Sequence, residues 1–385
     1  MKFTLLATAP LGLESVVARE VRQLGYETTE VDNGRIIYEA DDLGISRSNL
    51  WLRAADRVMM ILGEFPATTF EELFEGTKAL PWSELLPIDA RFPVEGRSVK
   101  SQLSSVPACQ AIVKKAIVAN MQEKFHQEWF DETGALYSIE VSIHRDIATL
   151  AIDTSGSGLH KRGYRTLTGP APIKETLAAS LVMLSRWEPH RPFADFLCGT
   201  GTIAIEAALL ALRIAPGSFR SFASEDFAFM DKKAYQEARE EVADLADYTR
   251  KTTILASDID PAAVRMAQTH AVRAKVSEHI DFRVLPAAEF YSKEQYGCVV
   301  TNPPYGQRLG DDKEVRILYE QMRGIMKVMP TWSFFVLSAH PDFTRFFGKK
   351  ADKNRKLYNG RIECHLYQYL GPLPPRHRES QDALT

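Results

Sequence analysis

The sequence predicts an α/β protein in two parts, a mixed α+β first part followed by a doubly wound parallel sheet. From Glu175 onward, short buried strand segments alternate regularly with helical segments, which is typical of a parallel sheet. Before about residue 160, strands and helices both occur but without that regular alternation. Between the two parts, Gly156, Gly158 and Gly163 punctuate the chain, and Pro170 and Pro172 follow. This composition predicts a domain boundary.

Hydrophobic periodicity separates the strands from the helices of the first part. The predicted strands are Phe3 to Thr8, Ile36 to Glu39, Phe92 to Ser101, Tyr137 to Ile143 and Ile147 to Asp153. The predicted helices are Leu13 to Leu24, a stretch that Pro81 ends, and Pro107 to Phe125. The apolar segment from Trp51 to Ile61 fits either a helix or an extended strand.

The second part is expected to continue strand by helix to a final hairpin. Its predicted strands are Phe193 to Leu197, Thr253 to Ser257, Phe282 to Leu285, Cys298 to Thr301 and Trp332 to Leu337. Its predicted helices are Glu175 to Trp187, Thr202 to Leu212, Ala262 to Ala274 and Val315 to Met329. Asn359-Gly360 then joins two strand-like segments with the signal of a type I′ turn. We therefore expect the sheet to finish with an antiparallel strand.

Composition limits the classes of function. The chain has 385 residues, 45% apolar and 25% charged, which is ordinary for a soluble globular protein of two or three domains. A formal net charge of −3 argues against a uniformly basic nucleic-acid coat but leaves room for a local basic patch. Four cysteines without a CxxC pair, and nine histidines without ligand spacing, predict neither a disulfide framework nor a metal site. Since no secretion signal or membrane-spanning stretch stands out, we expect a cytoplasmic protein with reduced cysteines.

A glycine-containing loop follows the first strand of the second part. Glycine at such a strand-to-helix turn allows the backbone to approach a ligand closely, and the helix N-terminus favours negative charge. The alternative is a tight turn without a ligand. The loop lacks the third glycine of the dinucleotide fingerprint and the lysine of a P-loop, so NAD and ATP are disfavoured. Candidate cofactor-binding residues here are Asp195, Cys198, Gly199, Thr200, Gly201 and Thr202.

Asp258 ends the next predicted strand. A carboxylate at this position can accept hydrogen bonds from both ribose hydroxyls of a nucleoside-containing cofactor. Asp260, two residues on, fits equally well as the cap of a helix that begins at Pro261. We therefore assign the ribose to Asp258 and count Ile259 beside it among the cofactor-binding residues.

The segment Thr301-Asn302-Pro303-Pro304-Tyr305-Gly306 is the most informative in the chain. Two prolines stiffen the backbone after a buried strand and place an amide and an aromatic ring side by side. The Asn302 Oδ1 atom and the Pro303 carbonyl can accept the two N–H bonds of an exocyclic amine, while the Tyr305 ring stacks on the base. We assign catalysis to Asn302, Pro303, Pro304 and Tyr305, and also count Asn302 among the cofactor-binding residues. The alternative is an ordinary proline turn.

Together, DFLCGTGT, SDID and TNPPYGQRLG resemble motifs I, II and IV of class I S-adenosylmethionine-dependent methyltransferases that methylate amines. GRSVKSQLSSVPACQAIVKKAI, SIEVSIHRDIATLAIDTSGSGLHKRGYR and APIKETLAASL resemble the THUMP-containing guanine-N2 RNA methyltransferases, particularly the bacterial group related to the large-subunit rRNA enzyme. The resemblance covers nearly the whole chain. It implies an N-terminal ferredoxin-like region (residues 1–60), a THUMP RNA-binding domain (61–160), a Rossmann-like methyltransferase domain (161–375) and a polar tail (376–385).

Three departures from the family pattern stand out. Phe196 follows Asp195 where the family usually has proline. Val284 is followed by Leu285-Pro286-Ala287-Ala288, with no acidic residue where related enzymes often hold the adenine amino group. Residues from about 216 to 250 look like an acidic, helical insertion to which the sequence assigns no role.

Basic residues in two regions are candidates for RNA contact. One cluster falls in the first part and just beyond it, and the other near the final hairpin, where Phe343 to Arg361 carries a net charge of +6 from seven basic residues and one acidic residue. The alternative is a solvated charged surface. The candidates are Lys100, Lys114, Lys115, Lys161, Arg162, Arg165, Lys349, Lys350 and Arg355.

The resemblance implies methyl transfer from S-adenosylmethionine to the N2 amine of a guanine in RNA, with 23S rRNA as the expected partner. Guanine-N2 methylation of tRNA is an alternative. Adenine-N6 methylation is a further one, since the same tetrad serves both amines. An alternative outside the enzymes is an RNA-binding or ribosome assembly factor that keeps the fold without catalysis.

Overall fold

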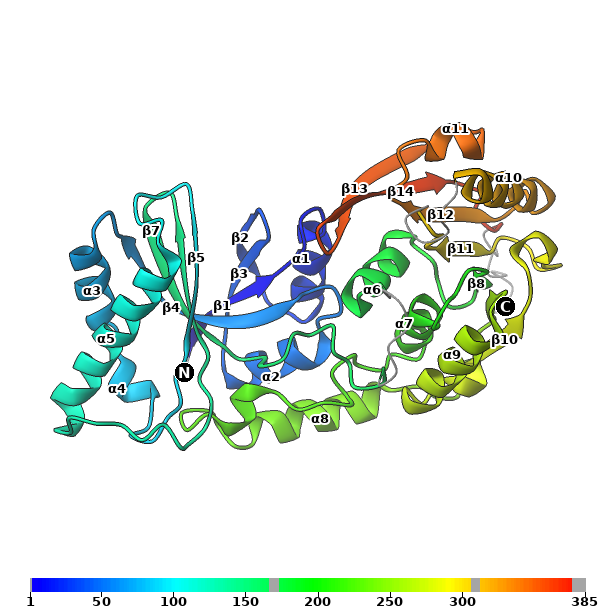
Figure 1. Cartoon of the computed structure of the whole chain (residues 1–385). Coiled ribbons are helices and arrows are strands. Elements are labelled where there is room, and N and C mark those ends of the chain that lie inside the picture. Colours follow the sequence, from blue (N-terminus) through cyan, green and yellow to red (C-terminus); the bar gives the residue numbers. More distant parts are fainter. Residues whose placement is uncertain (1, 166–172, 306–311, 376–385) are drawn as a thin grey trace, which may run out of the picture. The chain divides into compact units, whose positions relative to one another are not determined.

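The structure is a computed structural model that describes residues 2–165, 173–305 and 312–375. It divides into two compact units, a first unit of Met1–Gly163 with Ile214–Ala246 and a second unit of Tyr164–Arg213 with Asp247–Thr385. Figure 1 shows the path of the chain, which passes from one unit to the other three times. We call Ile214–Ala246 the inserted segment, because it belongs to the first unit but interrupts the sequence of the second.

The first unit is built on one seven-stranded sheet, ordered β2-β3-β1-β4-β7-β6-β5. Every neighbouring pair is antiparallel except β5 with β6. The strands are β1 (Phe3–Thr8), β2 (Thr28–Asp32), β3 (Arg35–Ala40), β4 (Arg57–Pro66), β5 (Val94–Val99), β6 (Ile139–His144) and β7 (Ile147–Asp153). The helices are α1 (Glu14–Gln23), α2 (Asp42–Trp51), α3 (Phe70–Lys78), α4 (Trp82–Leu85), α5 (Val106–Phe125) and, from the inserted segment, α8 (Ala234–Leu245).

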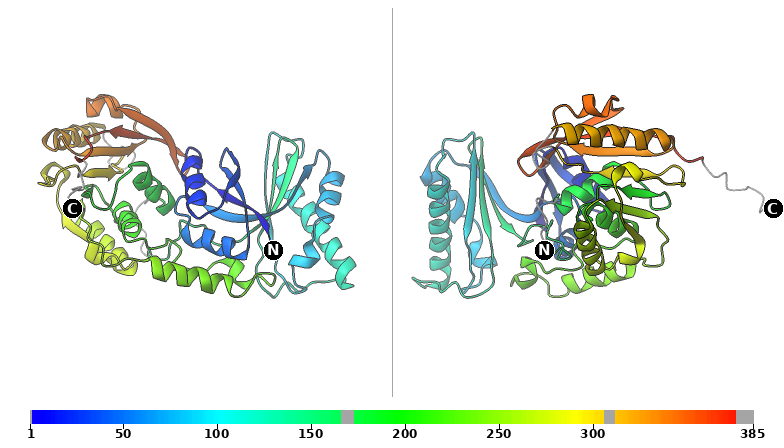
Figure 2. Two further views of the ribbon diagram at one scale, coloured as in Figure 1. Left: turned by 180° about the vertical axis from the view of Figure 1, so that it is seen from behind. Right: turned by 45° about the vertical axis from the view of Figure 1, so that its right-hand side comes forward.

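Strand β4 joins the ferredoxin-like and THUMP-like parts of this sheet. Its residues Arg57 to Ile61 pair with β1, and Met59 to Pro66 pair with β7, with a register shift between Ile61 and Gly63. Helices α3 and α5 pack against each other, and α5 also packs on β5 (Figures 1 and 2). The regions that the sequence separates at about residue 60 therefore share one sheet.

Helix α8 of the inserted segment packs on α2 (Figure 2). The Arg47 guanidinium donates to both carboxylate oxygens of Glu241, at 2.7 and 2.9 Å. The buried Asn49 amide donates to the Tyr235 hydroxyl at 3.3 Å and to the Thr154 hydroxyl at 3.0 Å. The inserted segment is therefore built into the core of the first unit.

The stretch before α8 also contacts the THUMP-like part of the first unit. The Phe227 ring stacks on Tyr137 with a centroid distance of 4.4 Å. The Arg220 guanidinium donates to the carbonyl oxygens of Ser155, Ser157 and Gly158, and so holds the loop that follows β7. The sequence predicts a methyltransferase domain over residues 161–375 with a helical insertion from about 216 to 250, and the partners of the inserted segment named here belong to the first unit.

The second unit is built on another seven-stranded sheet, ordered β10-β9-β8-β11-β12-β14-β13. Its first five strands are parallel and β14 is antiparallel to both neighbours, which confirms the predicted fold class and the antiparallel finish. The strands are β8 (Phe193–Asp195), β9 (Ile254–Asp258), β10 (Ile280–Val284), β11 (Cys298–Thr301), β12 (Ser333–Ser338), β13 (Lys353–Asn359) and β14 (Ile362–Tyr369).

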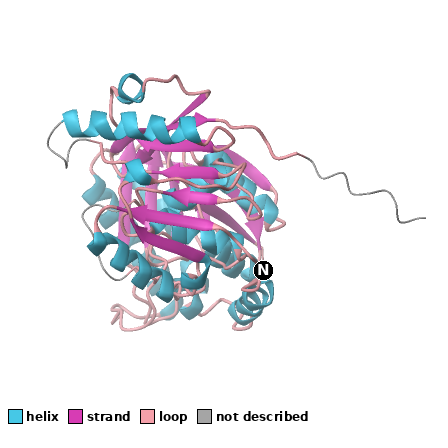
Figure 3. Cartoon of the chain, turned by 90° about the vertical axis from the view of Figure 1, so that its right-hand side faces the viewer, coloured by secondary structure: helices cyan, strands magenta, loops and turns pink. Residues whose placement is uncertain are grey.

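Helices flank this second sheet, as Figure 3 shows. They are α6 (Glu175–Leu184), α7 (Thr202–Ala211), α9 (Pro261–Arg273), α10 (Asp312–Val328) and α11 (Phe343–Phe347). Helices α10 and α11 cover a large core that includes Phe334, Val336 and Tyr367 of the sheet. Short single-turn 3₁₀ helices occur at Ala223–Asp226, Ser277–His279 and Ala287–Glu289. In the described ranges, no helix combines the length and apolarity needed to cross a bilayer.

Two elements of the first unit escape hydrophobic periodicity. Helix α2 buries Ser46, Ser48 and Asn49 rather than an apolar stripe, and their side chains make hydrogen bonds inside the unit. Strand β2 is a largely exposed edge strand with a polar sequence. The ambiguous segment from Trp51 to Ile61 contains the last residue of α2 and the start of β4.

We predict that Asn49→Ala loosens the inserted segment. The substitution leaves the buried hydroxyls of Ser155 and Tyr235 without one partner each, at about 1–3 kcal/mol for each group. Hydrogen exchange of α8 amides, followed by mass spectrometry, is expected to accelerate at least tenfold. Gln236→Ala, which removes an exposed side chain from the same helix, is the matched control and should change little. Equal exchange in both variants would contradict this role of Asn49.

Candidate active site

The candidate site residues follow the carboxyl ends of β8, β9 and β11. The chain builds outward from β8 through β9 to β10, and then returns to the other side of β8 for β11. Such a reversal of strand order is the switch point at which open α/β sheets bind ligands. Asp195, the glycine loop and Asn302 therefore lie at the edge of the sheet where a ligand is expected.

Backbone hydrogen bonds and close packing fix the glycine loop. The Gly199 amide donates to Asp258 Oδ2 at 2.8 Å. Gly199 has a φ of +51°, and a Cβ atom at that position would meet nothing within 4 Å, so its open side can admit a ligand. Gly201 has a φ of +81°, and a Cβ atom there would lie 2.8 Å from the Ala267 Cβ atom. Glycine is thus needed at 201 for packing against α9.

The side chains of Cys198 and Thr202 in this loop are buried, so the loop offers a ligand its backbone groups rather than these side chains. Cys198 and Thr202 are 7% and 3% exposed, and burial raises the pKa of the Cys198 thiol. Helix α7 begins at Thr202, so its first amides lie beside the loop. The buried His270 on α9 places its Nδ1 atom 3.2 Å from the Thr200 carbonyl oxygen and so supports the loop from behind.

Asp195 is buried between two loops, with 1% exposure. Its Oδ1 atom accepts from the Thr301 hydroxyl at 2.7 Å and from the Leu197 amide at 3.3 Å. Burial raises its pKa from 3.8 to about 7, and the neighbouring Asp258 carboxylate acts in the same direction. Asp195 thereby links the end of β8 to the residue that precedes Asn302.

The carboxylate of Asp258 is half-buried at the end of β9. Besides the Gly199 amide, it accepts from the Asp260 amide at 3.0 Å through Oδ1. Each carboxylate oxygen keeps a further lone pair for a ligand hydroxyl. Asp260 accepts from the Ala262 amide and caps α9, which is the alternative that the sequence offered for it.

Apolar side chains are exposed beside Asp258. Ile259 is 67% exposed and Val284, at the end of neighbouring β10, is 54% exposed. The Leu285 amide donates to the Asp258 carbonyl oxygen at 3.0 Å, which keeps these two strand ends together. Two exposed apolar side chains therefore lie at the strand ends where the sequence lacks the expected acidic residue.

The Asn302–Tyr305 segment is held from two sides. The Tyr305 hydroxyl donates to Asn302 Oδ1, and burial raises the pKa of the Tyr305 phenol, so it remains a donor. The Tyr319 hydroxyl of α10 donates to the Pro304 carbonyl oxygen at 3.0 Å and lies 3.1 Å from the Ser338 hydroxyl of β12. The predicted stacking ring and amide thus come together. The rest of TNPPYGQRLG, from Gly306 to Gly310, lies outside the described residues.

Four supporting residues were not among the predicted site residues. Thr301 holds Asp195, Tyr319 and Ser338 hold the proline segment, and the Cys364 Sγ atom of β14 lies 4.0 Å from the Tyr305 hydroxyl. Thr301 had a sequence signal, as a hydroxyl at the end of a buried strand directly before the motif. The other three come from distant elements and carry no local signal.

The predicted RNA-binding residues of the two clusters differ in how far they are buried. Arg162 is 2% exposed and donates to the carbonyl oxygens of Leu159 and Arg53, so it supports the fold and we do not carry it further as a phosphate contact. Lys114 is bound to Glu132, and Arg165 to Glu175. The side chains of these three residues have protein partners. Residues with outward positions or partial exposure are Lys100, Lys115, Lys161, Lys349, Lys350 and Arg355.

Family comparisons agree with this architecture. The fold and site define a class I methyltransferase fold joined to an RNA-binding region. The chain belongs to the RMKL-like methyltransferase domain family, whose family model matches residues 162–368. An RlmL ferredoxin-like domain matches residues 4–59, and a THUMP domain matches residues 67–153. The bounds of the methyltransferase match enclose the inserted segment.

Relatives of this chain match over their whole length. YpsC of Bacillus subtilis (strain 168), whose name gives RNA methyltransferase as a provisional activity, is 49% identical over 99% of this chain and 100% of its own. A crystal structure from Listeria monocytogenes (strain 4b F2365), named a predicted N6-adenine-specific DNA methylase, is 53% identical, with a TM-score of 0.92 over 97% of each chain. SMU.472, described as a methyltransferase in complex with SAH, is 43% identical, with a TM-score of 0.92 over 97% of this chain and 99% of its own.

Among the described residues, no group of three or more His, Cys, Asp or Glu side chains is placed to hold a metal ion.

We predict that Asp195 makes stability depend on pH. Because its pKa is about 7 in the folded protein and 3.8 ordinarily, the folded state binds more protons than the unfolded state between these values. The free energy of unfolding should fall as pH rises through this window, by up to about 1.4 kcal/mol per pH unit, and level off above it. Urea unfolding should show this slope in the parent protein relative to Asp195→Asn. A pH-independent difference between the two proteins would contradict the raised pKa.

Proposed function

We propose that the protein transfers a methyl group from S-adenosylmethionine to the N2 amine of a guanine in RNA, with 23S rRNA as its substrate. The observation that carries this proposal is the Asn302–Tyr305 segment, which lies at the switch point and is joined to the glycine loop through Thr301 and Asp195. The segment proposed to hold the amine therefore lies at the same edge of the sheet as the loop proposed to hold the cofactor.

The residues at this edge fit S-adenosylmethionine. The open side of Gly199 leaves room for close backbone approach, Asp258 keeps lone pairs for ribose hydroxyls, and Ile259 with Val284 offers an apolar place for adenine. When bound, the cofactor supplies an electrophilic methyl group on a sulfonium that leaves uncharged. The protein therefore has to place the amine and direct its lone pair, and needs no strong base.

Asn302 and Pro303 are the acceptors for the amine. The Asn302 Oδ1 atom and the Pro303 carbonyl would take its two N–H bonds, which turns the nitrogen lone pair out of the plane of the base. In this structure the Tyr305 hydroxyl donates to Asn302 Oδ1, so an entering amine has to replace that hydrogen bond. The Tyr319 and Ser338 hydroxyls keep the proline segment in place during the exchange.

The nature of the substrate rests on the domains and the relatives. The THUMP match and the name of YpsC support RNA. The choice of 23S rRNA over tRNA rests on the resemblance of the sequence to the large-subunit rRNA group of THUMP-containing enzymes. The name of the Listeria relative keeps adenine N6 as a competing acceptor, because the same two acceptors can hold either amine. A target base inside a helix must be flipped out, so we expect it in a loop or an accessible stem.

Nucleoside mass spectrometry decides between these acceptors. We expect 23S rRNA from a deletion strain to lose N2-methylguanosine at one site, and the purified protein to restore it. Asn302→Ala protein serves as the inactive control. Loss of N2-methylguanosine from tRNA, or loss of N6-methyladenosine, would replace the substrate proposed here. An unchanged set of nucleosides would favour an RNA-binding factor without catalysis.

If Asn302 accepts the amine, its loss should lower the methyl-transfer rate but leave cofactor affinity almost unchanged. Asn302→Ala should lower the single-turnover rate by roughly 10²–10³, the effect of losing one preorganised polar group. Cofactor affinity, measured by calorimetry, should change less than about threefold, since Gly199 and Asp258 are untouched. A full rate in Asn302→Ala would mean that the segment is only a turn.

Tyr305 offers a second, independent prediction. Tyr305→Ala should weaken methylation by about 1–3 kcal/mol through lost stacking on the base. Tyr305→Phe keeps the ring and removes the hydroxyl that occupies Asn302 Oδ1, so it should retain a rate near that of the parent protein. Single-turnover assays on deletion-strain rRNA compare the two. If Phe is as damaging as Ala, the hydroxyl rather than the ring carries the function.

A further inference from the structure

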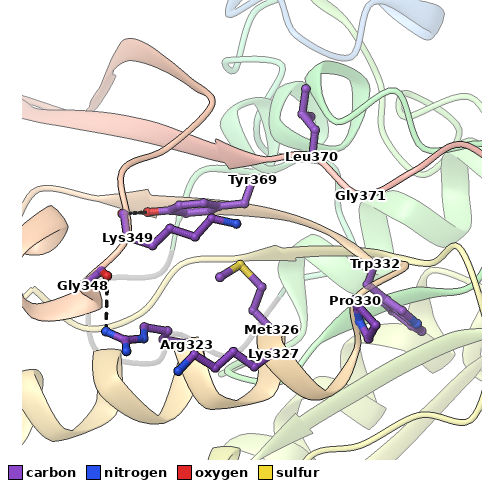
Figure 4. Close-up of a pocket in the computed structure, with 10 residues that line it drawn as sticks. All are labelled: Arg323, Met326, Lys327, Pro330, Trp332, Gly348, Lys349, Tyr369, Leu370 and Gly371. Carbon is purple, nitrogen blue, oxygen red and sulfur yellow. Dashed lines mark hydrogen bonds between the residues drawn. The ribbon is translucent and has the colours of Figure 1, made fainter.

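A cavity of about 400 Å³ lies at the edge of the second sheet opposite to the candidate active site. It is bounded by the end of α10, the turn after α11, the start of β12 and the end of β14 (Figure 4). The cavity adjoins Trp332, directly before β12, whereas the active-site edge lies after the carboxyl ends of the parallel strands. The six residues of β12 separate the two edges by roughly 20 Å.

Three cations from two segments surround this cavity. Arg323 and Lys327 come from α10, and Lys349 comes from the turn after α11 (Figure 4). Within the described part of the chain, no carboxylate forms a salt bridge with any of the three. Asp352 lies nearby, and its Oδ2 atom accepts from the Leu370 amide at 2.7 Å. The cavity therefore carries a local excess of positive charge.

The positions of these cations are set by the backbone around them. The Arg323 Nη1 atom donates to the Gly348 carbonyl oxygen at 3.2 Å. Gly348 has a φ of +68°, and a Cβ atom there would collide with Arg323 Nη1, so glycine makes this close approach possible. The Lys349 ammonium lies 5.7 Å from the centre of the Tyr369 ring, whose hydroxyl donates to the Lys349 carbonyl oxygen.

The chemistry of the lining fits a phosphate group with part of the nucleotide that carries it. Met326, Trp332, Tyr369 and Leu370 give the cavity an apolar wall, and the three cations lie around it. The volume is at the lower end of the range for small-ligand sites. Arginine and lysine without carboxylate partners are the residues that bind phosphate in water.

We propose that this cavity binds a backbone phosphate of the RNA substrate, on nucleotides that flank the target base. The inference rests on the proposed function only in taking RNA as the substrate. The exposed Lys350 and Lys353 continue the positive charge from the cavity onto the edge strand β13, which favours a polyanion over a small metabolite. RNA whose target base lies at Asn302 would have to extend about 20 Å to reach the cavity.

The test compares two pairs of substitutions in the full chain. Lys327→Gln with Lys349→Gln removes two cations of the cavity, neither of which makes a side-chain hydrogen bond within the described part of the chain. Lys251→Gln with Lys293→Gln removes two exposed cations elsewhere on the second unit and is the matched control. Filter binding of deletion-strain 23S rRNA is measured over a range of salt concentrations, with cofactor calorimetry as a check on folding.

We expect the cavity variant to bind RNA roughly tenfold more weakly and to lose about 0.7–0.9 from the slope of log affinity against log salt, as for one lost phosphate contact. The single-turnover rate at saturating RNA and the cofactor affinity should stay at parent values. Equal RNA affinity and slope in the cavity and control variants would overturn the proposal. Binding of uridine monophosphate or inorganic phosphate in the cavity, without any change in RNA binding, would assign it to a free ligand instead.

This readout is independent of which base is methylated. If mass spectrometry replaces guanine N2 by another acceptor, the binding comparison still applies to whichever RNA is the substrate. If the cavity variant binds RNA normally while methylation is as proposed, only the inference about the cavity fails.

Discussion

The hydrogen bond from the Thr301 hydroxyl to the Asp195 carboxylate is the contact on which the candidate site depends. It joins the end of β11 to the end of β8, the two strands that meet at the switch point of the sheet. The same Asp195 oxygen accepts from the Leu197 amide, at the start of the glycine loop. Thr301 directly precedes Asn302, so the hydrogen bond also fixes the start of the proline segment. Since Asp195 is buried and its pKa is raised to about 7, removing its partner would leave a buried carboxyl group without that compensation.

The inserted segment completes the first unit although it interrupts the sequence of the second unit. Tyr235 and Phe227 lie inside the methyltransferase match in the sequence but are buried in the first unit. Arg220, from the same segment, holds the loop after β7. A chain cut near residue 165 would carry this segment without the surfaces that bury it. RNA-binding and catalytic functions are therefore separable by point substitutions more cleanly than by truncation.

Sequence patterns were most informative where chemistry is local. Asp195, Gly199, Asp258 and Asn302 each follow a buried strand, and a parallel sheet brings such strand ends to one edge, so their proximity could be expected. The contacts that orient them could not, because Tyr319 and Ser338 lie on elements far along the chain.

Buried polar groups account for most of the remaining differences. Helix α2 has no apolar stripe because Ser48 and Asn49 are buried through hydrogen bonds, a pairing that periodicity does not detect. Arg162 is of a residue type that often binds phosphate, but its guanidinium donates to two backbone carbonyl oxygens. Only the fold shows these partners. The partners of the inserted segment had no sequence signal. Of the cations around the cavity only Lys349 had one, since the cavity is assembled from separated segments.

Thr301→Val tests the central claim most directly, because it keeps the shape of a buried side chain and removes only the hydroxyl. Calorimetry with S-adenosylhomocysteine and single-turnover methylation should be measured on this variant, with Thr301→Ser as the control that keeps the hydroxyl. The account predicts weaker cofactor binding together with a slower rate in Val, both about tenfold or more for a lost buried hydrogen bond, and near-parent values in Ser. Parent-like affinity and rate in Thr301→Val would show that the cofactor loop and the amine-binding segment are positioned independently.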